Sequence, residues 1–282
     1  MISIPIINAK STIKTRPDYL AELRKAKAGR VFLYTSREYA ADEQRYRGDM
    51  RLLAENISYY ESKGLEVGVW IDGFGHGVVL AHEEKANYPK HFTKIRGLMS
   101  GEECDDSFCP TDSRYVEAYS DFVCQVVNAG AKMIMIDDDL RFAWRGVALV
   151  GCACENHIRL FNERMKETGW WTHDYTREEL AEVVFVGETS QERKMWLQLM
   201  GDTMREFAKE LRKRVDVVNP DVRLGHCSCL STWDLDGIDS IELARIFAGN
   251  TKPFMRLVGA PYWNMLRKPS SWMQMSRYCS AD

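Results

Sequence analysis

The stretch MIMIDDD, residues Met133–Asp139, places four apolar residues directly before three consecutive aspartates. A short apolar run is typical of a buried strand, but an unpaired buried carboxylate is costly, so the aspartates must face water, a metal ion or a ligand. In barrels of alternating strands and helices, catalytic groups lie at the C-terminal ends of the strands. The stretch therefore predicts a core strand with a candidate active site at its end.

Short β-rich runs recur along the chain, and each is followed by a helical pattern. This alternation implies parallel strands joined by crossover helices. The chain has neither a Gly-x-Gly-x-x-Gly after its first strand nor a Walker loop, so a nucleotide-binding open sheet has no support. The predicted strands are Ile2–Asn8, Arg30–Thr35, Glu66–Ile71, Lys132–Ile136, Val222–His226 and Phe254–Val258.

Six such units predict an α/β fold of the TIM (β/α)8 type that lacks two units, so we expect an incomplete barrel; either the chain continues beyond Asp282 or the barrel is a shortened one. No Pro-, Gly- or Ser-rich linker divides residues 1–282, which predicts a single partial barrel domain.

Local signals indicate where several helices begin and end. Gly29, Gly64 and Gly130 each precede a predicted strand, the position expected of a left-handed helix C-cap. Thr189, with Glu192 three residues later, has the arrangement of a capping box. Apolar residues from Met195 to Leu211 recur at spacings of three and four, which predicts one core-facing helical stripe.

The composition excludes several classes of protein. The net charge is -3 and no Lys/Arg run is interleaved with aromatic residues, so we expect no nucleic-acid partner. The sequence has no long apolar span or signal peptide, which predicts a cytoplasmic protein without a membrane partner; a homo-oligomer stays open. Among eight cysteines, the pairs Cys152/Cys154 and Cys227/Cys229 are spaced like metal ligands or strand-end thiols.

Two segments flank the aspartates: Phe108–Tyr115, which contains Cys109-Pro110, and Gly151–His157, which contains Cys-x-Cys-x-x-His. Together with the aspartates they resemble the barrel domain of family 42 glycoside hydrolases, the β-galactosidase-like enzymes, and related glycosidase-like barrels. In that family a Cys-Pro dipeptide opens the helix before the fourth strand. The fourth strand ends in a Val-Asp-Asn-Glu type sequence, and a Cys-x-Cys-x-x-Cys motif follows.

The resemblance implies roles for the aspartates. Asp139 stands at the Glu that is the family's general acid/base, Asp138 at the sugar-binding Asn, and Asp137 at the preceding Asp. Asp139 is one methylene shorter than that Glu, so it can protonate a glycosidic oxygen only if the strand or the substrate lies nearer by about one bond length. Neighbouring carboxylates raise one another's proton affinity, which helps to keep Asp139 protonated. The family's second carboxylate lies on a seventh strand, which we do not find in this chain.

The resemblance also implies a structural zinc site. Cys109, Cys152 and Cys154 match three of the family's cysteine ligands, and His157 stands in place of the fourth. Three thiolates and an imidazole suit the tetrahedral preference of zinc. From the spacing alone, a set of buried free cysteines is an equally good interpretation.

Polar and aromatic residues that suit sugar hydroxyls and sugar rings gather at the other predicted strand ends. Each alone also fits a structural role, but their shared position favours binding. They are Arg37 after the second strand, Trp70, Asp72 and His76 at the third, His226 and Trp233 at the fifth, and Arg256 and Trp263 at the sixth.

Three functions agree with these features. The first is a glycoside hydrolase with a carbohydrate substrate and Asp139 as acid/base. The second is a divalent-metal-dependent sugar isomerase, epimerase or lyase, in which Asp137, Asp139 and His226 bind Mg²⁺ or Mn²⁺. The third is a non-catalytic sugar-binding barrel, which the missing second carboxylate permits.

Overall fold

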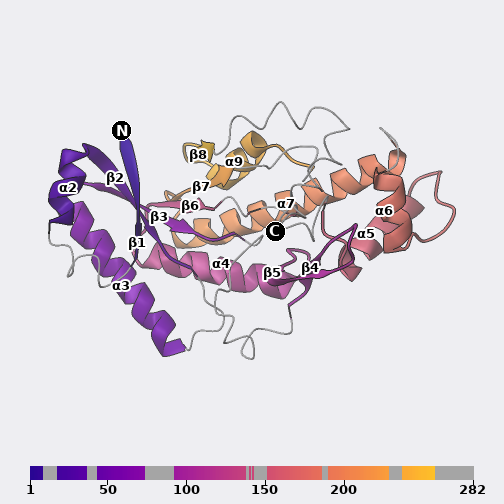
Figure 1. Ribbon diagram of the computed structural model, residues 1–282, viewed down its shortest axis with the longest axis horizontal. Helices are drawn as coiled ribbons and strands as arrows, with labels where there is room; N and C mark the ends of the chain where they lie inside the picture. The colour runs from indigo at the N-terminus through magenta and orange to yellow at the C-terminus, as the bar shows by residue number, and fades with distance from the viewer. Residues whose placement is uncertain are drawn as a thin grey trace.

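The computed structural model describes residues 1–8, 18–36, 43–73, 92–137, 140, 142, 151–185, 190–228 and 237–257. Its centre is a parallel sheet with the strand order β1-β2-β3-β6-β7-β8 (Figure 1). The strands are β1 (Ile2–Ile7), β2 (Ala28–Tyr34), β3 (Glu66–Ile71), β6 (Met133–Ile136), β7 (Arg223–Ser228) and β8 (Met255–Leu257). All six predicted strands are confirmed, and neighbours in the sheet follow one another in the chain, as in a TIM barrel.

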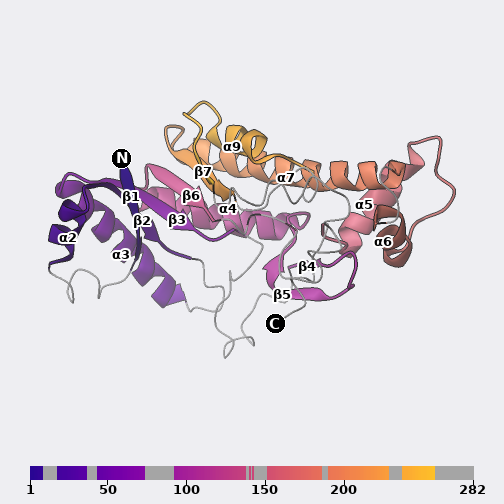
Figure 2. The same cartoon turned by 45° about the horizontal axis from the view of Figure 1, so that its top comes forward.

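Helices connect these strands and cover the sheet. They are α2 (Tyr19–Lys25), α3 (Glu43–Ser62), α4 (Ser113–Asn128), α5 (Glu155–Lys166), α6 (Arg177–Phe185), α7 (Gln191–Val218) and α9 (Ser240–Ala248). Helices α4 and α7 lie side by side, and α9 packs beside β7 (Figures 1 and 2). No helix in the described part of the chain is long and apolar enough to cross a bilayer.

A small antiparallel hairpin, β4 (Lys94–Arg96) and β5 (Glu103–Phe108), lies between β3 and α4 in the chain. The sequence did not predict it, because neither strand has the apolar run or the apolar–polar alternation of a core strand. The hairpin lies with α5 and α6 at the end of the molecule opposite β1 and α2 (Figure 1).

Alternation along the strands gives the sheet two different faces. Val31, Val69 and Ile134 belong to the main core beneath the helices. On the other, inner face Phe32, Met133 and Met135 form a second cluster, with Trp70 and Phe254 packed against it. Two glycines make room for this cluster, since a Cβ on Gly68 would meet the Phe32 ring and one on Gly225 would meet Phe254.

The helix ends agree only partly with the sequence signals. Gly64 and Gly130 adopt φ values of +81° and +106°, as expected of C-caps. The prediction for Gly29 was wrong: it lies inside β2, because α2 ends earlier and Lys27 takes the positive φ of 53°.

Helix α7 begins one residue later than predicted. Its N-cap is Ser190, whose Oγ accepts a hydrogen bond from the backbone N–H of Arg193 at 3.0 Å, rather than Thr189, which lies outside the described residues. The predicted apolar stripe is confirmed, with Trp196, Met204 and Leu211 buried.

Candidate metal centre and strand-end site

Cys109, Cys152, Cys154 and His157 come together in one buried cluster whose ligand atoms all lie within 4.8 Å of one another. Cys109 directly follows β5, the other two cysteines precede α5, and His157 lies in the first turn of α5. The loop between β6 and α5, the first turn of α5 and the loop before α4 thus supply the four groups.

The spacing within this cluster fits a tetrahedral metal site. The Cys109 and Cys154 sulfurs are 3.6 Å apart, and His157 Nδ1 lies 3.4 Å from the first and 3.5 Å from the second. Bond lengths of about 2.3 Å to sulfur and about 2.0 Å to nitrogen give tetrahedral edges of about 3.8 Å and about 3.5 Å. The cluster therefore has the donor set and the dimensions to hold a metal ion such as zinc.

The hydrogen bonds of His157 orient it as a ligand. Its Nε2 lies 3.1 Å from Thr203 Oγ1, and the Thr203 hydroxyl donates its own proton to the Leu199 carbonyl at 2.9 Å. The Thr203 oxygen must therefore accept from Nε2–H, which leaves the lone pair of Nδ1 directed at the sulfurs. Such outer partners hold metal-bound histidines in one tautomer. The ring of Phe142 packs edge-on against His157, with centroids 5.5 Å apart.

Neighbouring groups also act on the thiols. Burial raises the pKa of Cys109 and of Cys152, whereas hydrogen bonds from these two cysteines lower the pKa of Cys154. The backbone N–H of Arg96 donates to Cys152 Sγ at 3.4 Å, and Thr111 Oγ1 lies 3.0 Å from Cys109 Sγ. A bound cation stabilises the thiolate form of a buried cysteine. Metal binding at this cluster would therefore release protons from the thiols to solvent.

Asp112 fixes the start of α4 next to the cluster. Its carboxylate caps the helix at the N–H of Arg114 and accepts the backbone N–H of Thr93 at 2.8 Å. Burial alone would raise the pKa of Asp112, but the hydrogen bonds from Arg114 and Thr93 lower it to about 2. The loop that bears Cys109 is thereby tied to the segment that enters the hairpin.

A second group of residues gathers on the inner face of the sheet, at the C-terminal ends of β2, β3 and β6. The Tyr34 hydroxyl donates to Asp72 Oδ1 at 2.7 Å, and the Tyr34 and Trp70 rings meet edge to face at 6.3 Å. The Tyr119 hydroxyl of α4 donates to the Asp72 backbone carbonyl at 2.6 Å. Asp72 is therefore held from both sides.

Asp137 continues the inner face beyond β6. Its N–H donates to the Ile71 carbonyl at 2.8 Å, so the parallel ladder extends to this residue. Alternation from Met133 and Met135 places its half-buried side chain on the same face as Trp70 and Asp72. Tyr34 is not among the predicted site residues, although its position two residues after Phe32 places it on this face.

The structure does not bring His226 to this group. It pairs in register with Ile136, whose side chain faces the helices, and its ring lies 6.0 Å from that of Phe247 in α9. His226 is fully buried, and neither ring nitrogen has a hydrogen-bond partner among the described residues. Burial lowers the pKa of His226 to about 4.

For one further candidate residue, Arg256, the structure gives only the position of the backbone. Arg256 lies in β8, in register with Cys227 of β7. The remaining predicted site residues fall outside the part of the chain that the structure describes, namely Asp138, Asp139, Arg37, His76, Trp233 and Trp263.

Comparisons with known proteins bear on the fold. No family model matches the chain, and no curated protein matches it. Among solved structures, a β-galactosidase from the psychrophilic Marinomonas ef1 is 12% identical, with a TM-score of 0.63 over 95% of this chain and 42% of that one. A β-galactosidase from Bacillus circulans sp. alkalophilus is 13% identical, with a TM-score of 0.61 over 97% and 41%.

The catalytic domain of a β-amylase from Paenibacillus polymyxa is 9% identical, with a TM-score of 0.58 over 99% of this chain and 82% of that one. This chain spans about two fifths of the length of the two β-galactosidases. The predicted fold class is confirmed: the chain has the α/β fold of glycosidase TIM barrels, and its structure is similar to the β-galactosidase barrels that its sequence resembles.

Proposed function

We propose that this chain is a carbohydrate-active barrel that hydrolyses a glycosidic bond, with Asp139 as the general acid/base. One observation carries the proposal: Tyr34, Trp70, Asp72 and Asp137 gather at the C-terminal ends of three neighbouring strands, where the acidic stretch begins. This is the edge at which TIM barrels place their chemistry. The similarity of this fold to glycosidase barrels supports the assignment of sugar chemistry to this edge.

Each residue has a defined part in this proposal. Asp139 protonates the glycosidic oxygen as the bond breaks, and Asp137, two residues earlier, raises its proton affinity through like charge. Trp70 offers an aromatic surface to a sugar ring, and Asp72, held in place by Tyr34, accepts a hydrogen bond from a hydroxyl. Hydrolysis also needs a second carboxylate, which the resemblance assigns to a seventh barrel strand.

The acid/base role is tested by Asp139→Asn in the full-length protein. We expect kcat for an aryl glycoside to fall at least about a hundredfold, because a positioned acid or base contributes about 10² to 10⁴. Asp221→Asn is the matched control, since Asp221 is exposed in the turn before β7, at the opposite end of the strands. Unchanged turnover in Asp139→Asn would refute the assignment.

The alternative of a metal-dependent isomerase, epimerase or lyase required Asp137, Asp139 and His226 to share one ion. The register of β7 directs His226 toward the helices, on the face opposite Asp137. This alternative therefore has no support from the described residues. A non-catalytic sugar-binding barrel would be identified by saturable sugar binding without turnover in the full-length protein.

We also infer that Cys109, Cys152, Cys154 and His157 hold a structural zinc ion. Four protein ligands would fill a tetrahedral shell and leave no open position for a substrate, so the ion would stabilise the loops rather than take part in chemistry.

Elemental analysis tests the zinc site. The purified protein should contain about one equivalent of zinc, and Cys152→Ser should lose it. Cys124→Ser is the matched control, because Cys124 is a half-buried thiol on α4 outside the cluster, and it should retain the metal. A fully stable protein that contains no metal would contradict the zinc assignment.

A further inference from the structure

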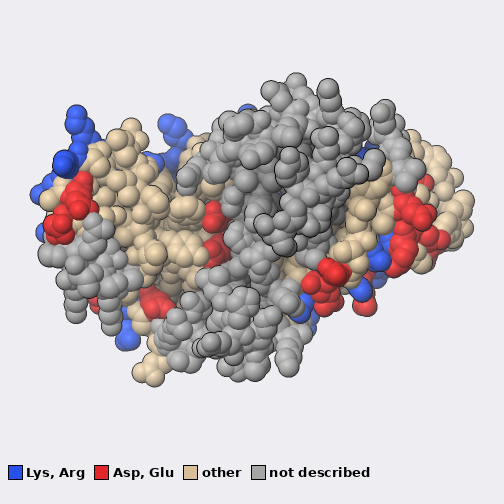
Figure 3. Space-filling model, viewed as in Figure 1, with Lys and Arg blue, Asp and Glu red and all other residues tan. Residues whose placement is uncertain are grey.

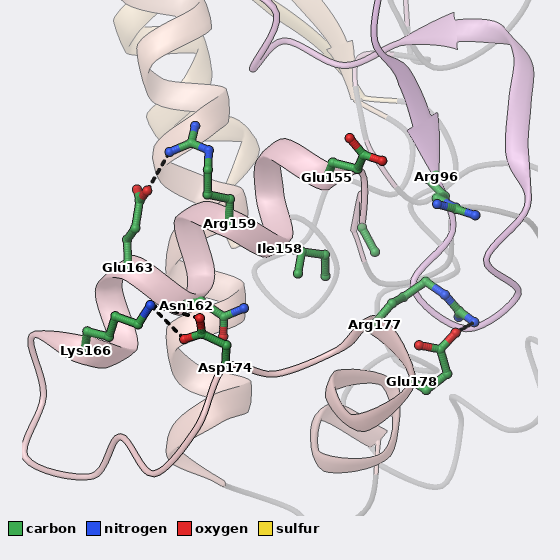
Figure 4. Close-up of a pocket in the computed structure, with 11 residues that line it drawn as sticks. Arg96, Glu155, Ile158, Arg159, Asn162, Glu163, Lys166, Asp174, Arg177 and Glu178 are labelled. Atoms are coloured by element: carbon green, nitrogen blue, oxygen red, sulfur yellow. Dashed lines mark hydrogen bonds and ion pairs between the residues drawn. The ribbon is translucent and has the colours of Figure 1, made fainter.

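A cavity of about 520 Å³ lies between the hairpin, α5 and α6 (Figure 4). None of its lining residues belongs to the parallel sheet, so it is distinct from the strand-end site. Arg96 and Glu155 lie toward one end of it, and Lys166 and Asp174 toward the other (Figure 4). Its volume is within the range of about 300 to 1,000 Å³ that is usual for small-ligand sites.

The charges around this cavity balance. Four cationic and four anionic side chains line it, and acidic and basic groups are interspersed on the surface at this end of the molecule (Figure 3). Most of them are already in ion pairs at 2.6 to 2.8 Å, namely Arg159 with Glu163, Lys166 with Asp174, and Arg177 with Glu178. A lining with no net charge favours a neutral, hydrogen-bonding ligand over an anion or a cation.

Glu155 provides an acceptor for such a ligand. It is exposed in the first turn of α5 and forms no hydrogen bond or ion pair with any residue that the structure describes. Hydroxyl groups suit this environment because each can donate to a carboxylate and accept from a guanidinium.

Two exposed aromatic residues lie in the loop that precedes Asp174, and one of them contacts residues that line the cavity. Trp170 and Trp171, in the loop between α5 and α6, are 57% and 41% exposed. Lys166 Nζ lies 5.5 Å from the Trp171 ring centroid, and Trp171 Nε1 donates to Asp174 Oδ1 at 3.2 Å. The Trp171 indole thus contacts Lys166 and Asp174, two residues that line the cavity. Large exposed aromatic side chains beside a polar cavity are typical of binding surfaces.

We propose that this cavity and the Trp170–Trp171 pair form a second carbohydrate-binding site, which takes a neutral oligosaccharide by stacking sugar rings on indole and bonding hydroxyls to the charged lining. The inference rests on the proposed carbohydrate function. The site would hold a chain substrate on the protein surface while the strand-end site acts on one bond.

The test measures two properties of each full-length variant. One is the affinity for maltotetraose, cellotetraose and β-1,4-galactotetraose by titration calorimetry, in an Asp139→Asn background that prevents turnover. The other is kcat/KM for a small aryl glycoside in the background with Asp139 intact. Trp171→Ala, Trp170→Ala and Glu155→Gln are compared with Ile241→Ala, which removes a 53% exposed apolar side chain from α9.

We expect Trp171→Ala to weaken binding of at least one tetrasaccharide about tenfold or more, with Trp170→Ala and Glu155→Gln acting in the same direction. Ile241→Ala should have no effect, and aryl-glycoside cleavage should stay unchanged in all four. The affinity measurement does not need catalysis, so it remains informative if no glycoside is cleaved.

Three results would overturn the second site. They are affinities within twofold of the parent in all three site variants, no binding of any of the three sugars by the parent, or a change of sedimentation coefficient in Trp171→Ala without a change of affinity. The last result would identify the tryptophans as a contact between copies of the chain.

Discussion

His226 lies in an environment that excludes its charged form. The side chain is fully buried against Phe247, and burial lowers its pKa to about 4 from the ordinary 6.5. In the unfolded chain this residue becomes protonated below about pH 6.5. In the folded chain it becomes protonated only near pH 4. His226 therefore favours the folded state only while it is neutral.

This environment predicts a pH dependence of stability. The contribution of His226 is fully present above about pH 6.5 and is lost as the pH falls to about 4, by about 2 to 3 kcal/mol in the free energy of unfolding. His226→Leu should remove this part of the slope in urea unfolding between these pH values. His173→Gln, which changes an exposed histidine, should keep it. Equal slopes in the parent and His226→Leu would show that folding does not lower the pKa of His226.

At the scale of elements, a pair of glycines lets α7 approach the segment before α9. A Cβ added to Gly201 would overlap the backbone carbonyl of Gly237, and Gly237 itself has a φ of +67°. Backbone atoms cannot move aside as the end of a flexible side chain can. This contact fixes the distance between α7 and the start of α9.

Gly201→Ala should therefore destabilise the protein by about 2 to 3 kcal/mol, the usual cost of overpacking, despite the better helix propensity of alanine. The control is Gly48→Ala in α3, where a Cβ would meet nothing within 4 Å. That change should stabilise the protein by up to about 1 kcal/mol. Thermal or urea unfolding compares the two, and equal effects of the same sign would contradict the proposed packing of α7.

At the scale of the whole molecule, the cysteine–histidine cluster joins parts of the chain that no strand pairing of the main sheet connects. It links the end of the hairpin, the loop before α5 and, through Thr203, helix α7. A metal ion held there would close the long loop between Cys109 and Cys152. It would therefore contribute to folding as well as to local geometry.

Metal removal should consequently loosen this end of the molecule. Treatment with a chelator should lower the melting temperature by roughly 10 °C, since each kcal/mol corresponds to about 2 to 4 °C in a protein of this size. Amide exchange should rise in the hairpin and in α5, and zinc should reverse both effects. Cys152→Ser should not respond to the chelator. An identical melting temperature with and without the chelator would rule out a structural metal.

The amino-acid sequence by itself determined the six strands of the parallel sheet, the alternation of strands and helices and the composition of the cysteine–histidine cluster. Apolar runs such as Met133–Ile136 report burial within a few residues, and the motifs that carry Cys109 and Cys152 are local. Only the tertiary structure decided which face each strand-end residue occupies. Tyr34 joined Asp72 and His226 turned toward Phe247 because strand register, which depends on neighbours distant in the chain, sets the direction of every side chain.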